Sequence, residues 1–234
     1  MNSNKTISMA EKEMPKIEAK KVPNSLREDV IKNLEASGNI GIELGVAAGD
    51  FSKKMVYSGK FRKFFGVDSY SDIHDVEEYK YALSNVGIER NYNLLRMNFD
   101  DAIDLFPDNY FDFIYVDGYA HTGEEGGETI VKWFKKLKVG GVYAGDDYHE
   151  DWPLVKWAVN DFINHVGLEL FITDITEDEG FSKYPSWFCI KNHNVKNITV
   201  SPHLLRLSRS EKIRIGLKRF FRNSIRKLER LIKN

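Results

Sequence analysis

ELGVAAG, residues 43–49, is the stretch of this 234-residue sequence that decides its fold. An apolar run over 39–44 (NIGIEL) leads into it and predicts a buried strand, and a helical pattern from about Gly49 to Tyr57 follows. Gly45 allows a tight turn, and Gly49 lets the helix start close to its neighbours, so that backbone amides face a ligand. The spacing is ExGxxxG, not the GxGxxG of dinucleotide oxidoreductases, and small residues also occur at such turns without a ligand.

Outward from this turn, short β-rich runs alternate with helical stretches. The further runs are KFFGVD (63–68), NLLRMN (93–98), FDFIYVD (111–117), GVYAGD (141–146), ELFITDI (169–175) and SWFCIKN (186–192), and helices are expected near 76–86, 102–105, 124–137 and 152–165. This order is typical of parallel βαβ units, and the last two runs predict an antiparallel pair at a sheet edge. We expect an α/β, Rossmann-like fold with a seven-stranded, mostly parallel sheet and helices on both faces.

The sequence predicts three segments. Residues 1–23 are polar and aperiodic, which predicts a flexible lead-in. The domain proper is expected over 24–195, beginning with a helix whose capping box is Ser25 with Glu28. Residues 204–234 form a tail. A single cysteine and the lack of any long apolar run exclude a disulfide framework, a thiolate metal cluster and a membrane span, and favour a cytoplasmic protein.

The formal net charge of −1 is unevenly distributed. Residues 204–234 contain eleven basic and two acidic residues, or +9, and the remaining 23 basic and 33 acidic residues give −10. Apolar residues at 213, 217, 220, 221, 225, 228, 231 and 232 form one helical stripe. A basic amphipathic helix is therefore predicted, for an anionic membrane surface or alternatively for a partner helix, a homo-oligomer contact or a solvated tail. The acidic body argues against nucleic acid as a partner.

An acidic side chain follows the second strand. Asp68, nineteen residues after Gly49, can accept hydrogen bonds from both hydroxyls of a ribose at the point where open α/β sheets bind ligands. With the glycine turn, this acid resembles the first two motifs of the class I S-adenosylmethionine-dependent methyltransferases, and the resemblance extends over about residues 38–192.

The resemblance implies S-adenosylmethionine as the cofactor. Ser52 would then contact the methionyl carboxylate, Asn98 the adenine and Asp117 the methionyl amine, although each of these could instead be a cap or turn residue. The full set of expected cofactor-binding residues is Glu43, Gly45, Ala47, Gly49, Ser52, Asp68, Ser69, Asn98 and Asp117.

Three carboxylates follow the fourth and fifth strands. Asp117 lies in VDGYAH (116–121), and Asp146 and Asp147 end the run KLKVGGVYAGDDY (136–148). Carboxylates that converge repel one another unless a cation or a proton is shared, and oxygen ligands favour Mg²⁺ or Mn²⁺. The pattern is similar to the metal-dependent O-methyltransferases of the catechol and sugar types. We therefore expect Asp117, Asp146 and Asp147 to bind a divalent cation; the alternative is that Asp146 and Asp147 cap the helix near Trp152.

A hydroxyl acceptor also requires a base. The resemblance to the sugar-type enzymes implies His121, four positions after Asp117, with Asp117 as its catalytic neighbour; His149 is the rival, and either could be an ordinary loop residue. Aromatic side chains that could line an acceptor pocket, or else belong to the core, are Tyr119, Tyr148, Trp152 and Trp187.

These observations lead to three hypotheses for function. The first is an S-adenosylmethionine-dependent O-methyltransferase, assisted by a divalent metal, that methylates a saccharide hydroxyl of a polysaccharide or lipid-linked glycan at the cytoplasmic face of the membrane. The second is a methyltransferase for a natural product or catechol. The third is an inactive cofactor-binding scaffold recruited through its tail, against which the intact acids of the site argue.

Overall fold

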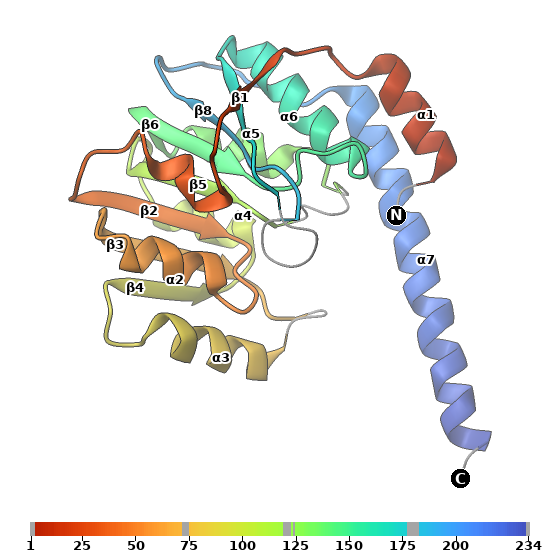
Figure 1. The fold of residues 1–234 in the computed structure, drawn as a ribbon. Coiled ribbons are helices and arrows are strands. Elements are labelled where there is room, and N and C mark those ends of the chain that lie inside the picture. The colour runs from red at the N-terminus through yellow and green to blue at the C-terminus, as the bar shows by residue number, and fades with distance from the viewer. Residues whose placement is uncertain (1–2, 72–74, 119–122, 124, 177–182, 233–234) are drawn as a thin grey trace.

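A mixed eight-stranded sheet forms the centre of the molecule (Figure 1). The computed structural model describes residues 3–71, 75–118, 123, 125–176 and 183–232, with side chains described up to 217. The spatial order of the strands is β1-β7-β8-β6-β5-β2-β3-β4. Their bounds are β1 (Ala19–Val22), β2 (Asn39–Leu44), β3 (Phe61–Asp68), β4 (Tyr92–Arg96), β5 (Phe111–Val116), β6 (Leu137–Gly145), β7 (Leu170–Thr173) and β8 (Trp187–Ile190).

All neighbouring strands are parallel except where β8 pairs with β6 and β7. The predicted Rossmann-like fold and the antiparallel pairing of the last two strands are thus confirmed, but β1, and not this pair, forms that edge of the sheet. The helical elements are α1 (Asn4–Glu13), η1 (Arg27–Ile31), α2 (Asp50–Tyr57), α3 (Val76–Val86), α4 (Phe99–Ala102), η2 (Ile103–Leu105), α5 (Glu128–Phe134), α6 (Pro153–Val166) and α7 (Pro202–Ile232).

The central strands are apolar on both faces because helices cover both. Along β5, Phe113 and Tyr115 pack with residues of η1 and α2, whereas Ile114 and Val116 pack with residues of α5 and α6. Successive side chains of a strand point to opposite faces, so an almost continuous apolar run is what a doubly covered strand requires.

The first 23 residues differ from the prediction of a flexible lead-in. They contain α1, which packs beside α6 and α7 and buries Ala10, and β1, which pairs in parallel with β7 at the sheet edge. The sheet therefore has eight strands instead of seven. These contacts join residues far apart in the chain, and a short, mostly polar strand such as AKKV carries no local signal for them.

The predicted capping box at Ser25 and Glu28 is also wrong. The Ser25 hydroxyl donates to the carbonyl of Val22 at 2.6 Å, and the carboxylate of Asp29 accepts from the amide of Leu26 at 2.9 Å. The element that follows is the short 3-10 helix η1. Because the amides of Asp174 and Ile175 both donate to the Ser25 carbonyl, the residues just before η1 are fixed to the chain that follows β7.

Helix α7 begins at the body and then leaves it (Figure 1). Its first turns bury Leu204 and Leu207 in the core, whereas Ile213 and Leu217 are 66% and 54% exposed. The structure confirms a tail helix and extends its start to Pro202. Among the described residues, no helix combines the length and apolar character needed to cross a membrane.

The buried carboxylate of Glu211 in α7 links this helix to the start of α1. It accepts hydrogen bonds from the Ser3 hydroxyl at 2.6 Å, from the Thr6 hydroxyl at 2.5 Å and from Nε of Arg214 at 2.6 Å. Burial opposes ionisation of Glu211, but these hydrogen bonds outweigh it and lower the pKa of the carboxyl group.

We expect Glu211→Gln to lower the free energy of unfolding at pH 7 by about 1–3 kcal/mol, since the charge-assisted hydrogen bonds weaken. The folded-state pKa lies below the unfolded value, so the stabilisation is complete above an unfolded pKa of about 4.3 and is lost as pH falls through the lower folded-state pKa. Urea unfolding of both proteins should therefore show a smaller difference at acid pH. Glu89→Gln, at an exposed position, is the control, and an effect of Glu211→Gln that does not change with pH would contradict the argument.

Candidate functional site

The turn between β2 and α2 lies against the end of β5. Gly45 has a φ of +96°, and a Cβ there would lie 2.6 Å from the amide nitrogen of Gly118. The amides of Asp117 and Gly118 donate to the carbonyl of Leu44 at 2.8 and 2.7 Å, which fixes this close approach. Gly49, with a φ of +83°, is the N-cap of α2. The turn thus requires glycine at the positions that the sequence singled out.

Asp68, the last residue of β3, organises the same turn. One carboxylate oxygen accepts from the amides of Val46 and Ala47 at 3.0 and 3.1 Å, and the other accepts from the amide of Tyr70 at 3.0 Å. The Tyr70 hydroxyl donates to the Ala47 carbonyl at 2.8 Å. Asp68 and the turn therefore form one unit at the carboxyl ends of β2 and β3, and the half-buried Ser69 follows directly.

Glu43 and Ser52 form a buried pair beneath this unit. The Ser52 hydroxyl donates to the carboxylate of Glu43, and neither side chain is accessible to solvent. Burial raises the pKa of Glu43 well above its ordinary value, although Ser52 and Arg27 oppose the shift. The Ser52 hydroxyl donates to Glu43 in this structure. This geometry therefore does not provide the expected contact of Ser52 with a methionyl carboxylate.

Asn98 lies beyond the carboxyl end of β4, as predicted. It occupies the N-cap position of the short helix α4, and its amide donates to Asp101 at 3.3 Å. The position therefore agrees both with an adenine contact and with the alternative of a residue at a helix start.

A cation that sequence reasoning missed lies within the carboxylate cluster. Arg27 of η1 forms an ion pair with Asp117 through one terminal nitrogen and with Asp146 through the other, the latter at 2.9 Å. Its guanidinium is 5% exposed and lies over the rings of Phe51 and Tyr115, 5.2 and 5.1 Å from their centroids. No local pattern distinguishes this arginine from a surface residue, since its partners lie 90 and 119 positions further along the chain.

The geometry does not fit a divalent metal at Asp117, Asp146 and Asp147. Arg27 already pairs with the first two, and the other oxygen of Asp146 accepts from the Ser186 hydroxyl at 3.1 Å. In the part of the chain that the structure describes, no three His, Cys, Asp or Glu side chains are grouped to bind a metal ion. The predicted metal site is therefore corrected to an ion-paired cluster.

The alternative interpretation of Asp146 and Asp147 as helix caps is not supported either, because the N-cap of α6 is Trp152. Asp147 is instead a buried residue with a φ of +58°. Burial raises the pKa of Asp146; Arg27 opposes this shift, and the neighbouring carboxylates Asp117 and Asp147 add to it.

Of the two candidate bases, His121 lies outside the described residues, as does the candidate pocket residue Tyr119. His149 is described, and its Nδ1 accepts from the amide of Asp151 at 3.1 Å. The lone pair of Nδ1 is therefore occupied by this hydrogen bond. This hydrogen bond makes His149 the weaker candidate.

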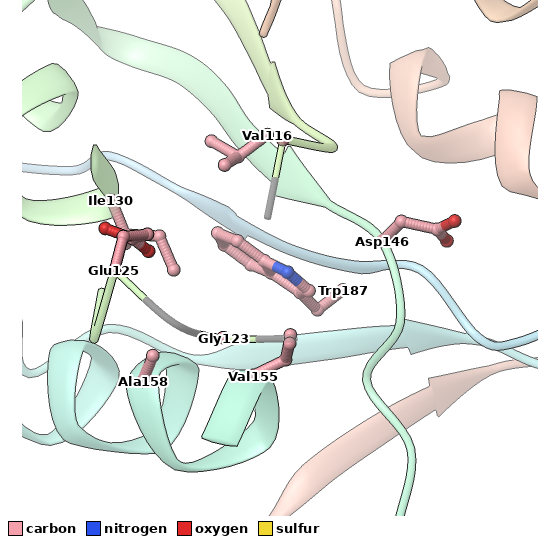
Figure 2. Close-up of a pocket in the computed structure, with 9 residues that line it drawn as sticks. Val116, Gly123, Glu125, Ile130, Asp146, Val155, Ala158 and Trp187 are labelled. Atoms are coloured by element: carbon pink, nitrogen blue, oxygen red, sulfur yellow. The ribbon is translucent and has the colours of Figure 1, made fainter. Parts of the chain in front are cut away.

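A small pocket opens beside the cluster, beyond the ends of β5 and β6 (Figure 2). Trp187 lies across it, and the side chain of Asp146 points away from it. Its lining residues are Val116, Gly118, Gly123, Glu125, Ile130, Asp146, Val155, Ala158 and Trp187. Of the predicted aromatic lining, Trp187 lies here, whereas Tyr148 is buried and donates to Asn160 at 2.7 Å. Trp152 packs edge-on against Tyr184, with the ring centroids 5.8 Å apart.

Residues 39–148, from the start of β2 to just past β6, match a protein family described as a methyltransferase domain. This match, with the Rossmann-like sheet and the glycine turn held by Asp68, supports a class I S-adenosylmethionine-dependent methyltransferase domain over these residues. A search of curated proteins gives no match.

Several solved structures share the fold at low sequence identity. Cofactor-bound Rv0187 from MTB is 13% identical, with 82% of this chain and 92% of that chain covered and a TM-score of 0.55. A protein from Klebsiella pneumoniae that is described as an O-methyltransferase is 12% identical, with 81% and 87% covered and a TM-score of 0.55. An rRNA methylase from Streptococcus thermophilus is 18% identical, with 71% and 94% covered and a TM-score of 0.51. Because the named acceptors differ, this likeness concerns the fold and not the substrate.

Proposed function

We propose that the protein is an O-methyltransferase that transfers the methyl group of S-adenosylmethionine to a saccharide hydroxyl of a polysaccharide or lipid-linked glycan. The observation that carries the proposal is the unit formed by the glycine turn and Asp68, with Asp117 a few ångströms away across the Leu44 carbonyl. Support for an oxygen acceptor comes from the sequence resemblance to sugar-type O-methyltransferases.

In this proposal each strand end binds one part of the cofactor. Asp68 accepts from the ribose hydroxyls, Asn98 contacts the adenine and Asp117 holds the methionyl amine. When bound, S-adenosylmethionine supplies an electrophilic methyl group on a sulfonium centre. His121 takes the proton from the acceptor hydroxyl.

The test is binding followed by transfer. Calorimetry with S-adenosylhomocysteine should give a dissociation constant in the micromolar range, and labelled S-adenosylmethionine should methylate glycan acceptors in a panel that also contains catechols and RNA. Labelling of a catechol or natural product only would replace the saccharide with a small-molecule acceptor. The absence of any S-adenosylhomocysteine binding would contradict the function as a whole.

We also propose that the tail helix binds an anionic membrane surface. Ile213 and Leu217 are exposed on a helix that leaves the body, and residues 204–234 carry a net charge of +9. Basic residues attract anionic headgroups at about 1 kcal/mol each, while apolar residues enter the interface. A lipid-linked acceptor would then be brought to the site by the same surface.

The double variant Ile213→Ser/Leu217→Ser should lose at least about tenfold in binding to phosphatidylglycerol vesicles, since each side chain contributes about 1 kcal/mol or more when buried. Flotation of the full-length proteins measures this. The matched control is Ile88→Ser/Leu105→Ser, which removes exposed apolar residues elsewhere on the body. Equal flotation of both variants would contradict the membrane proposal, and a loss of self-association instead would indicate a homo-oligomer contact.

A further inference from the structure

We propose that Arg27 is the cation of the carboxylate cluster, which makes this methyltransferase independent of a divalent metal, and that Arg27 acts as a positioning residue for Asp117 and Asp146. The inference rests on the proposed function and deepens it, because it states what orients the acids beside the cofactor and what supplies their counter-charge.

Electrostatic repulsion is expected among the three acids at the ends of β5 and β6. Asp117, Asp146 and Asp147 follow the ends of β5 and β6, which are hydrogen-bonded neighbours, so their charges converge. Arg27 contacts two of the three with separate nitrogens, and the side chains of Arg27 and Asp146 are 6% and 9% exposed. A planar guanidinium with two donors directed at two carboxylates fixes both the distance and the orientation between them. The cluster thus has its counter-charge within the chain.

Aromatic rings and backbone hydrogen bonds hold Arg27 in place. The guanidinium lies over both Phe51 and Tyr115, which adds cation–π attraction in a buried setting. Its backbone belongs to η1, and Ser25, two residues earlier, is hydrogen-bonded to Val22 and to the chain after β7. The fold therefore places the backbone of Arg27 beside the carboxylate cluster, and the side chain does not extend to it from the surface.

A divalent ion and Arg27 would compete for the same carboxylate oxygen atoms. A divalent ion would need carboxylate oxygens at about 2.0–2.6 Å, including those that accept from Arg27. It would also lie next to a fixed positive charge in a site of low dielectric constant. A metal ion at these residues would therefore compete with the ion pairs of Arg27.

The experiment measures Mn²⁺ binding by electron paramagnetic resonance in full-length wild type, Arg27→Gln and Arg27→Lys. We expect wild type to bind no Mn²⁺ at about 1 mM, the weak limit of protein sites for such ions, and Arg27→Gln to gain binding by at least about tenfold. Arg27→Lys should stay unable to bind Mn²⁺, because it keeps the charge. Arg62→Gln, at an exposed position of β3, is the matched control for loss of one arginine and should behave as wild type.

Tight Mn²⁺ binding by wild type that is lost in Asp147→Asn would overturn the proposal, and so would the absence of binding by a folded Arg27→Gln protein. If Arg27→Gln does not fold, the measurements on wild type and Arg27→Lys decide. Methyl transfer by wild type should persist after treatment with a chelator, and its loss would also overturn the proposal. The Mn²⁺ readout needs no acceptor, so it stays informative even if the saccharide assignment fails.

Discussion

Asp68→Ala should weaken binding of S-adenosylhomocysteine by at least about 100-fold and lower the free energy of unfolding by about 2–4 kcal/mol. The carboxylate accepts from three backbone amides, those of Val46, Ala47 and Tyr70, and so determines the shape of the glycine turn. Alanine leaves these amides without their acceptor and removes the proposed ribose contact at the same time. Calorimetry and urea unfolding measure the two effects separately.

The matched control for this prediction is Asp75→Ala. Asp75 is the N-cap of α3 and accepts from the amides of Glu77 and Glu78 at 2.9 and 3.1 Å. Its loss should cost about 1 kcal/mol of stability, as for other caps, without a comparable effect on S-adenosylhomocysteine binding. If both variants bound the ligand equally well, Asp68 would not be part of the cofactor site.

Gly45→Ala is expected to destabilise the protein by about 4 kcal/mol, from the strain of a positive φ and from the added methyl group. Its Cβ would lie 2.6 Å from the Gly118 nitrogen and 2.8 Å from the Asp117 carbonyl carbon, and both of these are backbone atoms. Relief requires the end of β5 to move away from the turn, which displaces Asp117. We therefore expect loss of S-adenosylhomocysteine binding even at a temperature where the variant is folded.

Gly38→Ala separates the two contributions. Gly38 has a φ of +84°, but no atom lies within 4 Å of a Cβ built there. This variant should show the conformational cost alone, about 1 kcal/mol, with unchanged ligand binding. Chemical denaturation of both proteins tests the difference, and equal losses would show that the close approach at Gly45 contributes nothing.

Sequence reasoning predicted those parts of the fold that depend on local patterns. The apolar runs of β5 and β6 and the glycine turn carry their own signals, because burial on both faces and a positive φ restrict the residue types directly. The sequence also indicated that Asp117, Asp146 and Asp147 needed a cation. It did not indicate Arg27, since an arginine in a polar segment is indistinguishable from a solvated one until its distant partners are known.

The same limit explains the errors at the N-terminus. Strand β1 is stabilised by pairing with β7, and α1 by packing beside α6 and α7, so neither has an amphipathic pattern strong enough to be read alone. The local sequence around Ser25 is typical of a capping box, but Ser25 is hydrogen-bonded to Val22 and to residues after β7 instead. Long-range contacts overrode the local preference.

The link between Ser3 and Glu211 has a consequence for synthesis on the ribosome. The two residues are 208 positions apart, and β1 pairs with a strand that begins at Leu170. Residues 3–22 therefore reach these contacts only after the residues from Leu170 to Glu211 have been synthesised. Contacts of such long sequence separation slow folding, because loop closure must precede them. Until then β7 has an unpaired outer edge.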